Sequence, residues 1–216
     1  MLKPWFQQIC TVKKEWSVYT FHNLRDFHRT TQGAGQKQNW IEKSFDSSKI
    51  DKVWVYFNPF AFHNRIGHTF LEFWFSDGQK LCVSAEGEQK LGESYSVIKS
   101  IRPWYRIRYL RWTHADTIGL RFNRKDKLYV YPMYMSKEHI QQLFRDLVEE
   151  TNKTGKHNEP YWLLFNNCTS WLRMVARKHL PIPKWNIWLL FNKFLPKMLH
   201  KLDVLKLSER KRVREV

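Results

Sequence analysis

A β-hairpin fixes much of what this chain can form. Two strand-like segments, residues 68–75 and 80–86, flank the tripeptide Ser76-Asp77-Gly78. A three-residue hairpin loop built on a type I turn needs a left-handed residue at its third position, where Gly78 stands. This loop sets Leu71 opposite Val83 within one apolar face. A two-residue loop would oppose Val83 with a glutamate, and because a slip of one residue inverts every side chain, the apolar face favours the longer loop.

The same register brings two polar residues together. His68 falls directly opposite Glu86, with both side chains on one face. A carboxylate beside an imidazole fixes its tautomer and raises its basicity, which is the orienting role in a catalytic triad. The alternative is a surface ion pair without function, so the pair needs a nucleophile to become a site.

Cys168 is the candidate nucleophile. Asn167 is a favoured helix N-cap, so Cys168 should lie in a first helical turn, where free N–H groups and the helix dipole favour a thiolate. Such settings lower a cysteine pKa from about 8.5 to roughly 3.5–7.5. A helix-start cysteine, a strand histidine and a polar third residue form a papain-type site, here in permuted order because His68 precedes Cys168. We expect the cysteine helix to cover the His68 face; a small buried cysteine is the alternative.

The remaining pattern predicts an α+β fold. Ser136 can cap a helix whose apolar stripe follows at residues 140–148. Residues 1–36 form a weakly patterned lead-in. Further strands are expected at residues 52–57, 104–112, 117–122 and 127–131. Strands followed by helices indicate an α+β domain with a largely antiparallel sheet.

The net charge calls for an anionic partner. The 216 residues contain 37 Lys+Arg against 20 Asp+Glu, a net charge of +17, which suits an anionic membrane surface or a nucleic acid, or simply keeps the chain soluble. Three cysteines are too few for a disulfide framework or a zinc site, and Cys10 and Cys82 are interpreted as structural. No metal and no cofactor is expected.

The two ends carry no readable export signal or membrane span. The N-terminus has no apolar core of a signal peptide before Lys13, and the apolar stretch at residues 185–199 is interrupted too often to cross a bilayer. An interfacial helix there would place Trp185 and Trp188 in a membrane surface, flanked by Lys193 and Lys197. The alternative is that this stretch packs back on the domain.

Nucleic-acid binding is the weaker alternative. Residues 102–112 interleave arginines with aromatic side chains, as grooves that stack bases do. No nucleic-acid fold signature accompanies them, and arginine and tryptophan also alternate in ordinary strands.

A series of short motifs resembles a known family over residues 50–180. The motifs are Phe57-Asn58-Pro59-Phe60, Gly67-His68-Thr69-Phe70-Leu71-Glu72-Phe73, Ser76-Asp77-Gly78, Val83-Ser84-Ala85-Glu86, Gly92-Glu93-Ser94-Tyr95-Ser96, Leu120-Arg121, Tyr131-Pro132 and Asn166-Asn167-Cys168-Thr169. They stand in the order of the Lnb-type domain, the N-terminal domain of a class of bacterial lipoprotein N-acyltransferases. The chain is thereby divided into a lead-in at 1–49, an Lnb-type domain at 50–180 and an amphipathic basic extension at 181–216.

The resemblance implies a fold and a site. The family resembles circularly permuted papain-like enzymes of the NlpC and lecithin:retinol acyltransferase types, with an antiparallel sheet and a cysteine-bearing helix. It implies Cys168 as nucleophile, His68 as base and Glu86 as third member, with Asn167 or Asn166 shaping the oxyanion site.

The function expected from these residues is thiol-dependent acyl transfer or hydrolysis through an acyl-enzyme. The substrate would be an acyl lipid, a lipoprotein or a peptide, at an anionic membrane surface. A cysteine peptidase or amidase is one alternative, and a non-catalytic basic protein that binds nucleic acid or membrane is another. The compartment expected is cytoplasmic or peripheral to a membrane, although relatives are often periplasmic.

Overall fold

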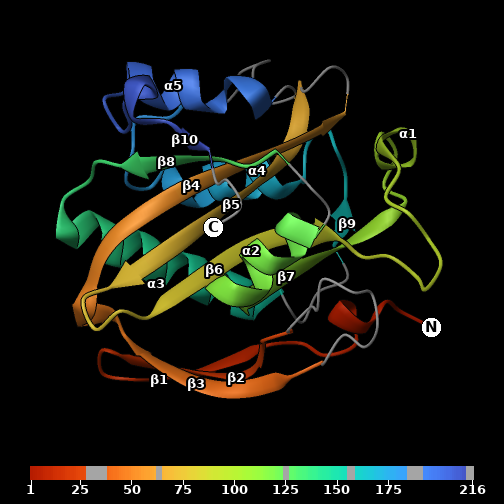
Figure 1. Cartoon of the computed structure of the whole chain (residues 1–216), viewed down its shortest axis with the longest axis horizontal. Helices are drawn as coiled ribbons and strands as arrows, with labels where there is room; N and C mark the ends of the chain where they lie inside the picture. The colour runs from red at the N-terminus through yellow and green to blue at the C-terminus, as the bar shows by residue number, and fades with distance from the viewer. Residues whose placement is uncertain (28–37, 62–64, 124–126, 155–158, 184–191, 213–216) are drawn as a thin grey trace.

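One large sheet with helices on both faces makes up the computed structural model (Figure 1), which describes residues 1–27, 38–61, 65–123, 127–154, 159–183 and 192–212. The strands are β1 (Thr11–Glu15), β2 (Val18–Arg25), β3 (Trp40–Asp46), β4 (Ile50–Ala61), β5 (Ile66–Phe75), β6 (Lys80–Gly87), β7 (Tyr105–Thr113), β8 (Tyr129–Met133), β9 (Pro160–Tyr161) and β10 (Lys211–Arg212). The helices are α1 (Val97–Ser100), α2 (His114–Asn123), α3 (Lys137–Thr154), α4 (Cys168–Ala176) and α5 (Leu195–Lys201), with short 3₁₀ turns that include η1 (Pro4–Phe6) and η4 (Asn192–Phe194).

The sheet is almost wholly antiparallel. Its order is β1-β2-β7-β6-β5-β4-β8-β10, with β3 paired to β2 and β9 paired to β7. The short contact of β2 with β7 is parallel. The α+β class and the antiparallel sheet predicted from the sequence are therefore present in the described residues.

Two apolar cores lie on the two faces of the sheet. The larger core packs α3 and α4 against residues such as Leu71 and Val83, and the smaller core includes Phe70 and Trp112. In Figure 1, α2 lies on one face of β6 and β7, and α3 and α4 lie on the other. Because the central strands are buried on both faces, their sequences are almost continuously apolar instead of alternating.

The predicted hairpin register is confirmed. Leu71 pairs with Val83 and Phe73 with Leu81, and the Phe75 N–H donates to the Gln79 carbonyl at 3.0 Å. Gly78 has a φ of +84°, the left-handed conformation that the three-residue loop requires.

The long helix α3 also follows the prediction. The Ser136 hydroxyl accepts a hydrogen bond from the His139 N–H at 3.3 Å, which caps the helix. Its apolar stripe is buried in the larger core: Ile140, Leu143, Phe144, Leu147 and Val148.

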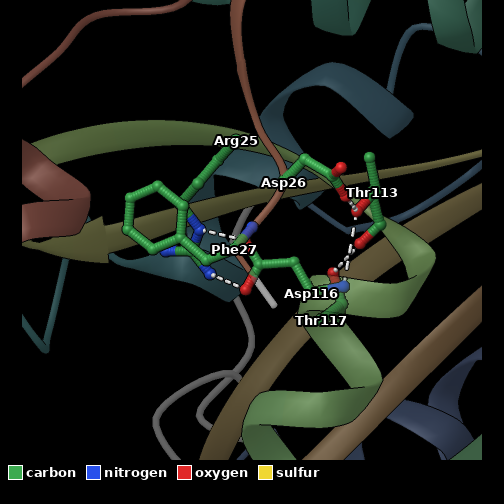
Figure 2. A network of polar contacts seen from close by, with 6 residues as sticks. All are labelled: Arg25, Asp26, Phe27, Thr113, Asp116 and Thr117. Atoms are coloured by element: carbon green, nitrogen blue, oxygen red, sulfur yellow. Dashed lines mark hydrogen bonds and ion pairs between the residues drawn. The ribbon is translucent and has the colours of Figure 1, made fainter. Parts of the chain in front are cut away.

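The prediction of a strand at residues 117–122 is wrong, because these residues belong to α2. A buried ion pair fixes the start of this helix: Arg25 Nε and Nη2 donate to the Asp116 carboxylate at 2.6 and 3.1 Å (Figure 2). The Thr117 hydroxyl donates to the Thr113 carbonyl at 2.9 Å. A partner from β2, distant in the sequence, therefore overrides the local strand propensity.

The N-terminal segment has more structure than its weak pattern indicates. Within residues 1–49, β1, β2 and β3 form an antiparallel layer that extends the main sheet through the contact of Arg25 with Trp112. In β2, the side chains of Tyr19 and Phe21 point into the larger core while their neighbours are more exposed, so the segment contributes directly to the fold.

The described part of the C-terminal extension packs back on the domain. Leu195 and Leu199 of α5 are buried in the larger core. Asn192 anchors the preceding turn, because its Oδ1 accepts from the Gly67 N–H at 2.7 Å and its Nδ2 donates to the Gly67 carbonyl. Trp185 and Trp188 lie outside the described residues. Among the described helices, none is long and apolar enough to cross a membrane.

Candidate active site

The helix start at Cys168 is built by its neighbours. Asn167 Oδ1 accepts from the N–H groups of Thr169 and Ser170 at 2.8 and 3.0 Å, and the Ser170 hydroxyl accepts from the Asn167 N–H at 2.7 Å. This reciprocal capping box begins α4 at Cys168. The predicted N-cap is therefore confirmed.

The thiol lies where two strands stop pairing. In β5 the N–H groups of odd-numbered residues face β6, as the bond from Phe75 to Gln79 indicates. The pairing of β5 with β6 ends with Leu71 opposite Val83. Two residues further along, the Thr69 backbone acts to lower the pKa of the Cys168 thiol. The thiol therefore lies beside the part of β5 that follows the last pair with β6.

Two side chains lie near the sulfur. The Thr169 hydroxyl is 3.8 Å from Cys168 Sγ, and Tyr161 of β9 acts to lower the pKa of the thiol. Thr169, the next residue along α4, donates its hydroxyl to Thr69 Oγ1 at 3.3 Å, which fixes the helix end against β5. Cys168 is buried, with 3% of its surface exposed.

Burial reverses the expected acidity of this cysteine. The pKa of the Cys168 thiol is raised, first because desolvation disfavours the thiolate and further because of the nearby Glu86 charge. The hydrogen bonds from Thr69, Thr169 and Tyr161 act in the opposite direction and do not outweigh burial. The expectation of a lowered pKa is therefore wrong for this structure: the helix start is present, but the sulfur lies too deep for it to dominate.

His68 and Glu86 come together as the hairpin register predicts. His68 Nε2 lies 3.5 Å from Glu86 Oε1 and 2.7 Å from the Ser84 hydroxyl. Both ionisable side chains are mostly buried. Glu86 therefore acts on both candidate residues, since it contacts the imidazole and its charge raises the pKa of Cys168.

The cysteine helix covers the opposite face from the one expected. His68 stacks on Phe70, which belongs to the smaller core, whereas Thr69 contacts α4. Consecutive side chains leave a strand on opposite faces, and Trp171 of α4 packs in the larger core. The α4 helix therefore lies on the larger-core face of β5, whereas the His68 side chain leaves the strand on the other face.

The two asparagines proposed for the oxyanion site are engaged elsewhere. Asn167 uses its carbonyl oxygen for the cap, and its Nδ2 donates to the Leu163 carbonyl at 2.5 Å. Asn166 Nδ2 donates to the Pro160 carbonyl at 2.9 Å. Both side chains shape the loop before α4, and the groups that act to lower the pKa of the thiol are Thr69, Thr169 and Tyr161. Thr69 stands beside His68 in a motif, but nothing local in the sequence marks Tyr161.

The Gly92-Glu93-Ser94-Tyr95-Ser96 motif builds the neighbouring segment. Tyr95 stacks on Tyr105 with ring centroids 5.5 Å apart and meets Tyr161 edge-on at 6.2 Å. Its hydroxyl donates to Ser100 Oγ at 3.0 Å, and Ser96 caps α1. The motif therefore holds α1 next to a tyrosine that contacts the thiol.

The residues that suggested nucleic-acid stacking are largely used by the fold. Tyr105 and Trp112 are buried. Arg111 is also buried and donates to the Cys10 carbonyl at 2.7 Å and to the Thr151 hydroxyl. Arg108 pairs with Glu88. Their alternation reflects the two faces of β7.

The described residues of the expected membrane anchor are few. Lys193 lies in η4 and Lys197 in α5, and both side chains are exposed. Both lysines belong to the segment of Leu195 and Leu199, whose apolar side chains are already buried against the domain.

Fold and site define an α+β domain with a capped cysteine helix, set against a histidine–glutamate pair on adjoining strands. Residues 36–202 match the family described as the Lnb N-terminal periplasmic domain, so the chain belongs to this family. The family's description as periplasmic gives no support to the cytoplasmic alternative. No curated protein and no solved structure matches the chain.

Proposed function

We propose that this domain is a thiol-dependent acyltransferase or hydrolase with a permuted papain-like site. Cys168 is the nucleophile, His68 the general base and Glu86 the residue that orients the imidazole. The observation that carries the proposal is the buried Cys168 thiol at a capped helix start, beside a strand whose His68 contacts Glu86 at 3.5 Å. Burial, neighbouring charge and directed hydrogen bonds together are typical of reactive sites.

The raised pKa of Cys168 means that the site needs a general base, the role proposed for His68. The resting group is a thiol, so a base must remove its proton before the sulfur can attack. His68 takes this proton, and the contact with Glu86 stabilises the imidazolium that results. The ion pair between thiolate and imidazolium then forms only as the substrate excludes water.

Acyl transfer proceeds through a thioester. The thiolate attacks the ester carbonyl of an acyl lipid, and the carbonyl π electrons move to oxygen. Collapse of the tetrahedral intermediate breaks the ester C–O bond, and the leaving alkoxide takes the proton from His68. An amine or water then attacks the thioester, gives its proton to His68, and releases the Cys168 thiol once that proton passes to sulfur.

Tyr161 and Thr69 replace the asparagines as candidates for the oxyanion site. Both act to lower the pKa of the Cys168 thiol, so both favour negative charge at this position and are candidates to stabilise an oxyanion formed beside the sulfur. Preorganised donors in a buried site stabilise a developing oxyanion strongly. The N–H of Cys168 at the helix start is a further donor of this kind.

The test is direct detection of the acyl-enzyme. The domain is incubated with a phospholipid acyl donor, and intact-protein mass spectrometry measures acylation of wild type, Cys168→Ala, His68→Ala and Glu86→Gln. Cys82→Ala is the matched control, because Cys82 is equally buried but bonds to Glu72 instead of the site. We expect acylation in wild type and in the control, slower acylation in Glu86→Gln, and none in Cys168→Ala or His68→Ala. Acylation that survives Cys168→Ala contradicts the proposal.

A second assay separates transfer from hydrolysis and from peptide cleavage. The acylated protein is isolated and offered an amine-bearing lipopeptide or buffer alone. Transfer predicts an N-acylated peptide, and hydrolysis predicts free fatty acid. Cleavage of a peptide substrate without acylation by lipid would favour the cysteine peptidase or amidase alternative.

A further inference from the structure

Two loop segments beside the thiol are joined into one surface. The first contains α1 and the residues after it, 97–106, and the second is the loop that connects β9 to α4, 162–167. The Leu163 N–H donates to the Ser100 carbonyl at 2.8 Å, and Trp162 Nε1 donates to the Ile101 carbonyl at 2.5 Å. These bonds fix the two segments to each other.

Large apolar side chains on this surface face outward. We call them the docking patch: Ile98, Ile101, Trp104, Leu164 and Phe165. Ile98 is 77% exposed, Trp104 64% and Phe165 50%. Exposed apolar clusters of this kind mark interaction sites on proteins, whereas single exposed residues need no explanation.

The patch connects directly to the neighbours of Cys168. Tyr161, which acts to lower the pKa of the Cys168 thiol, immediately precedes the second segment. Tyr95 contacts Tyr161 edge-on and donates its hydroxyl to Ser100, the last residue of α1. Phe60 meets Tyr95 edge-on at 5.7 Å and is itself 48% exposed, which extends apolar surface from the patch towards the site.

The two patch segments carry basic charge only. Residues 97–106 include the exposed Lys99, Arg102 and Arg106 and no acidic residue, and residues 162–167 carry no charge. Glu93, in the loop before α1, pairs with Lys99 at 3.5 Å. The Lys99 ammonium lies 5.1 Å from the centre of the Trp104 ring. Exposed tryptophan and aliphatic side chains bordered by basic groups are the composition of surfaces that lie in an anionic bilayer interface.

We infer that the docking patch binds the surface of an anionic lipid bilayer. The apolar side chains enter the boundary between headgroups and acyl chains, and Lys99, Arg102 and Arg106 contact lipid phosphates. Binding in this orientation places Tyr161 and the thiol behind it next to the lipid. The inference that the docking patch binds the bilayer does not depend on the proposed function, whereas delivery of an acyl chain to Cys168 rests on it.

Vesicle flotation tests this inference. Wild type is mixed with vesicles of phosphatidylcholine, alone or with 30% phosphatidylglycerol as a roughly physiological anionic fraction, and the bound fraction is measured. The variant Ile98→Ser/Trp104→Ser removes two patch side chains. Its matched control, Ile9→Ser/Trp16→Ser, removes one isoleucine and one tryptophan that are also exposed. Trp16 lies in the turn between β1 and β2, in the layer at the bottom of Figure 1, whereas α1 lies at its upper right edge.

The patch variant should bind anionic vesicles at least about tenfold more weakly, and the control should bind like wild type. Arg102→Gln/Arg106→Gln should lose roughly fivefold per residue on anionic vesicles and change little on neutral ones. Equal binding by patch variant and wild type overturns the inference. So does a wild-type dimer that the patch variant converts to monomer without change in vesicle binding, because the patch would then join two copies of the chain.

Cys168→Ala separates this inference from the proposed function. It should bind vesicles like wild type, since the thiol does not contact the membrane. Acylation lost in Cys168→Ala with binding retained supports both. Binding lost in the patch variant while a soluble short-chain donor still acylates Cys168 supports docking as a step apart from chemistry.

Discussion

The Thr169 hydroxyl, which follows Cys168 in α4, donates to Thr69 Oγ1 at 3.3 Å, two residues beyond the last pair of β5 with β6. This bond fixes the cysteine helix against β5. The residue next to Thr69 is His68, so consecutive positions of the strand supply the contact with α4 and the imidazole. The predictions below test the parts of this arrangement and the fold that supports it.

Tyr161→Phe should slow acyl-enzyme formation about 100-fold, because it removes a donor from the thiol site. The loss should fall on kcat, with KM nearly unchanged, since the hydroxyl stabilises charge that develops in the transition state. Steady-state kinetics with a soluble ester measure both constants. Tyr19→Phe, in the larger core, is the control, and equal rates for Tyr161→Phe and wild type contradict the assigned role.

Alkylation of Cys168 should depend steeply on pH. Its raised pKa keeps the thiol protonated at neutral pH, so the rate with a small haloacetamide should rise as pH increases beyond the ordinary cysteine value of about 8.5. Peptide mapping by mass spectrometry gives the rate at each pH. A rate that is already constant from pH 7 upward would indicate a resting thiolate.

Asn167→Ala should destabilise the domain by about 1 kcal/mol, because the helix cap is lost. Asn167→Ser should restore most of this stability, since serine also caps helices. Urea unfolding measures stability, and the acylation assay is run on both variants. If Asn167 only caps the helix, Asn167→Ser also restores activity; an inactive but stable Asn167→Ser would return this residue to the oxyanion site.

The buried ion pair of Arg25 with Asp116 should be costly to break on one side. Both side chains are almost fully buried, and Asp116 also accepts from the Phe27 N–H at 3.2 Å. Asp116→Asn or Arg25→Met should each cost about 3–5 kcal/mol, because the remaining charge is left uncompensated. The double variant should lose less than the sum of the two, as a double-mutant cycle by urea unfolding would record.

Glu72 should contribute stability that acid removes. Its fully buried carboxylate contacts His114, Trp74 and Tyr56, and these bonds, with the His114 charge, lower its pKa against the effect of burial. A lowered folded-state pKa means that the contribution is present above the unfolded value of about 4.3 and is lost as pH falls through the folded value.

Glu72→Gln should therefore destabilise the domain by about 1–3 kcal/mol at pH 7 and flatten the fall in stability below pH 5. Urea unfolding from pH 3 to pH 7 measures both effects. Asp51→Asn, at an exposed position, should alter neither.

The chain's own patterns determined the local parts of this protein. The turn glycine at 78 fixed the hairpin register, and with it the meeting of His68 and Glu86. Asn167 began the cysteine helix and Ser136 the long helix, because caps and stripes act within a few residues. The serial motifs indicated the family that residues 36–202 match.

Only the tertiary structure decided what depends on partners distant in the chain. The ion pair of Arg25 with Asp116 stabilises a helix where the sequence pattern predicted a strand. The packing of α4 buries Cys168, and this burial raises the pKa of its thiol. Tyr161 reaches the sulfur through the pairing of β9 with β7, for which the sequence carries no local signal. Burial and long-range contacts arise only when the elements assemble, so the sequence indicated the candidate site residues and the fold set their environment.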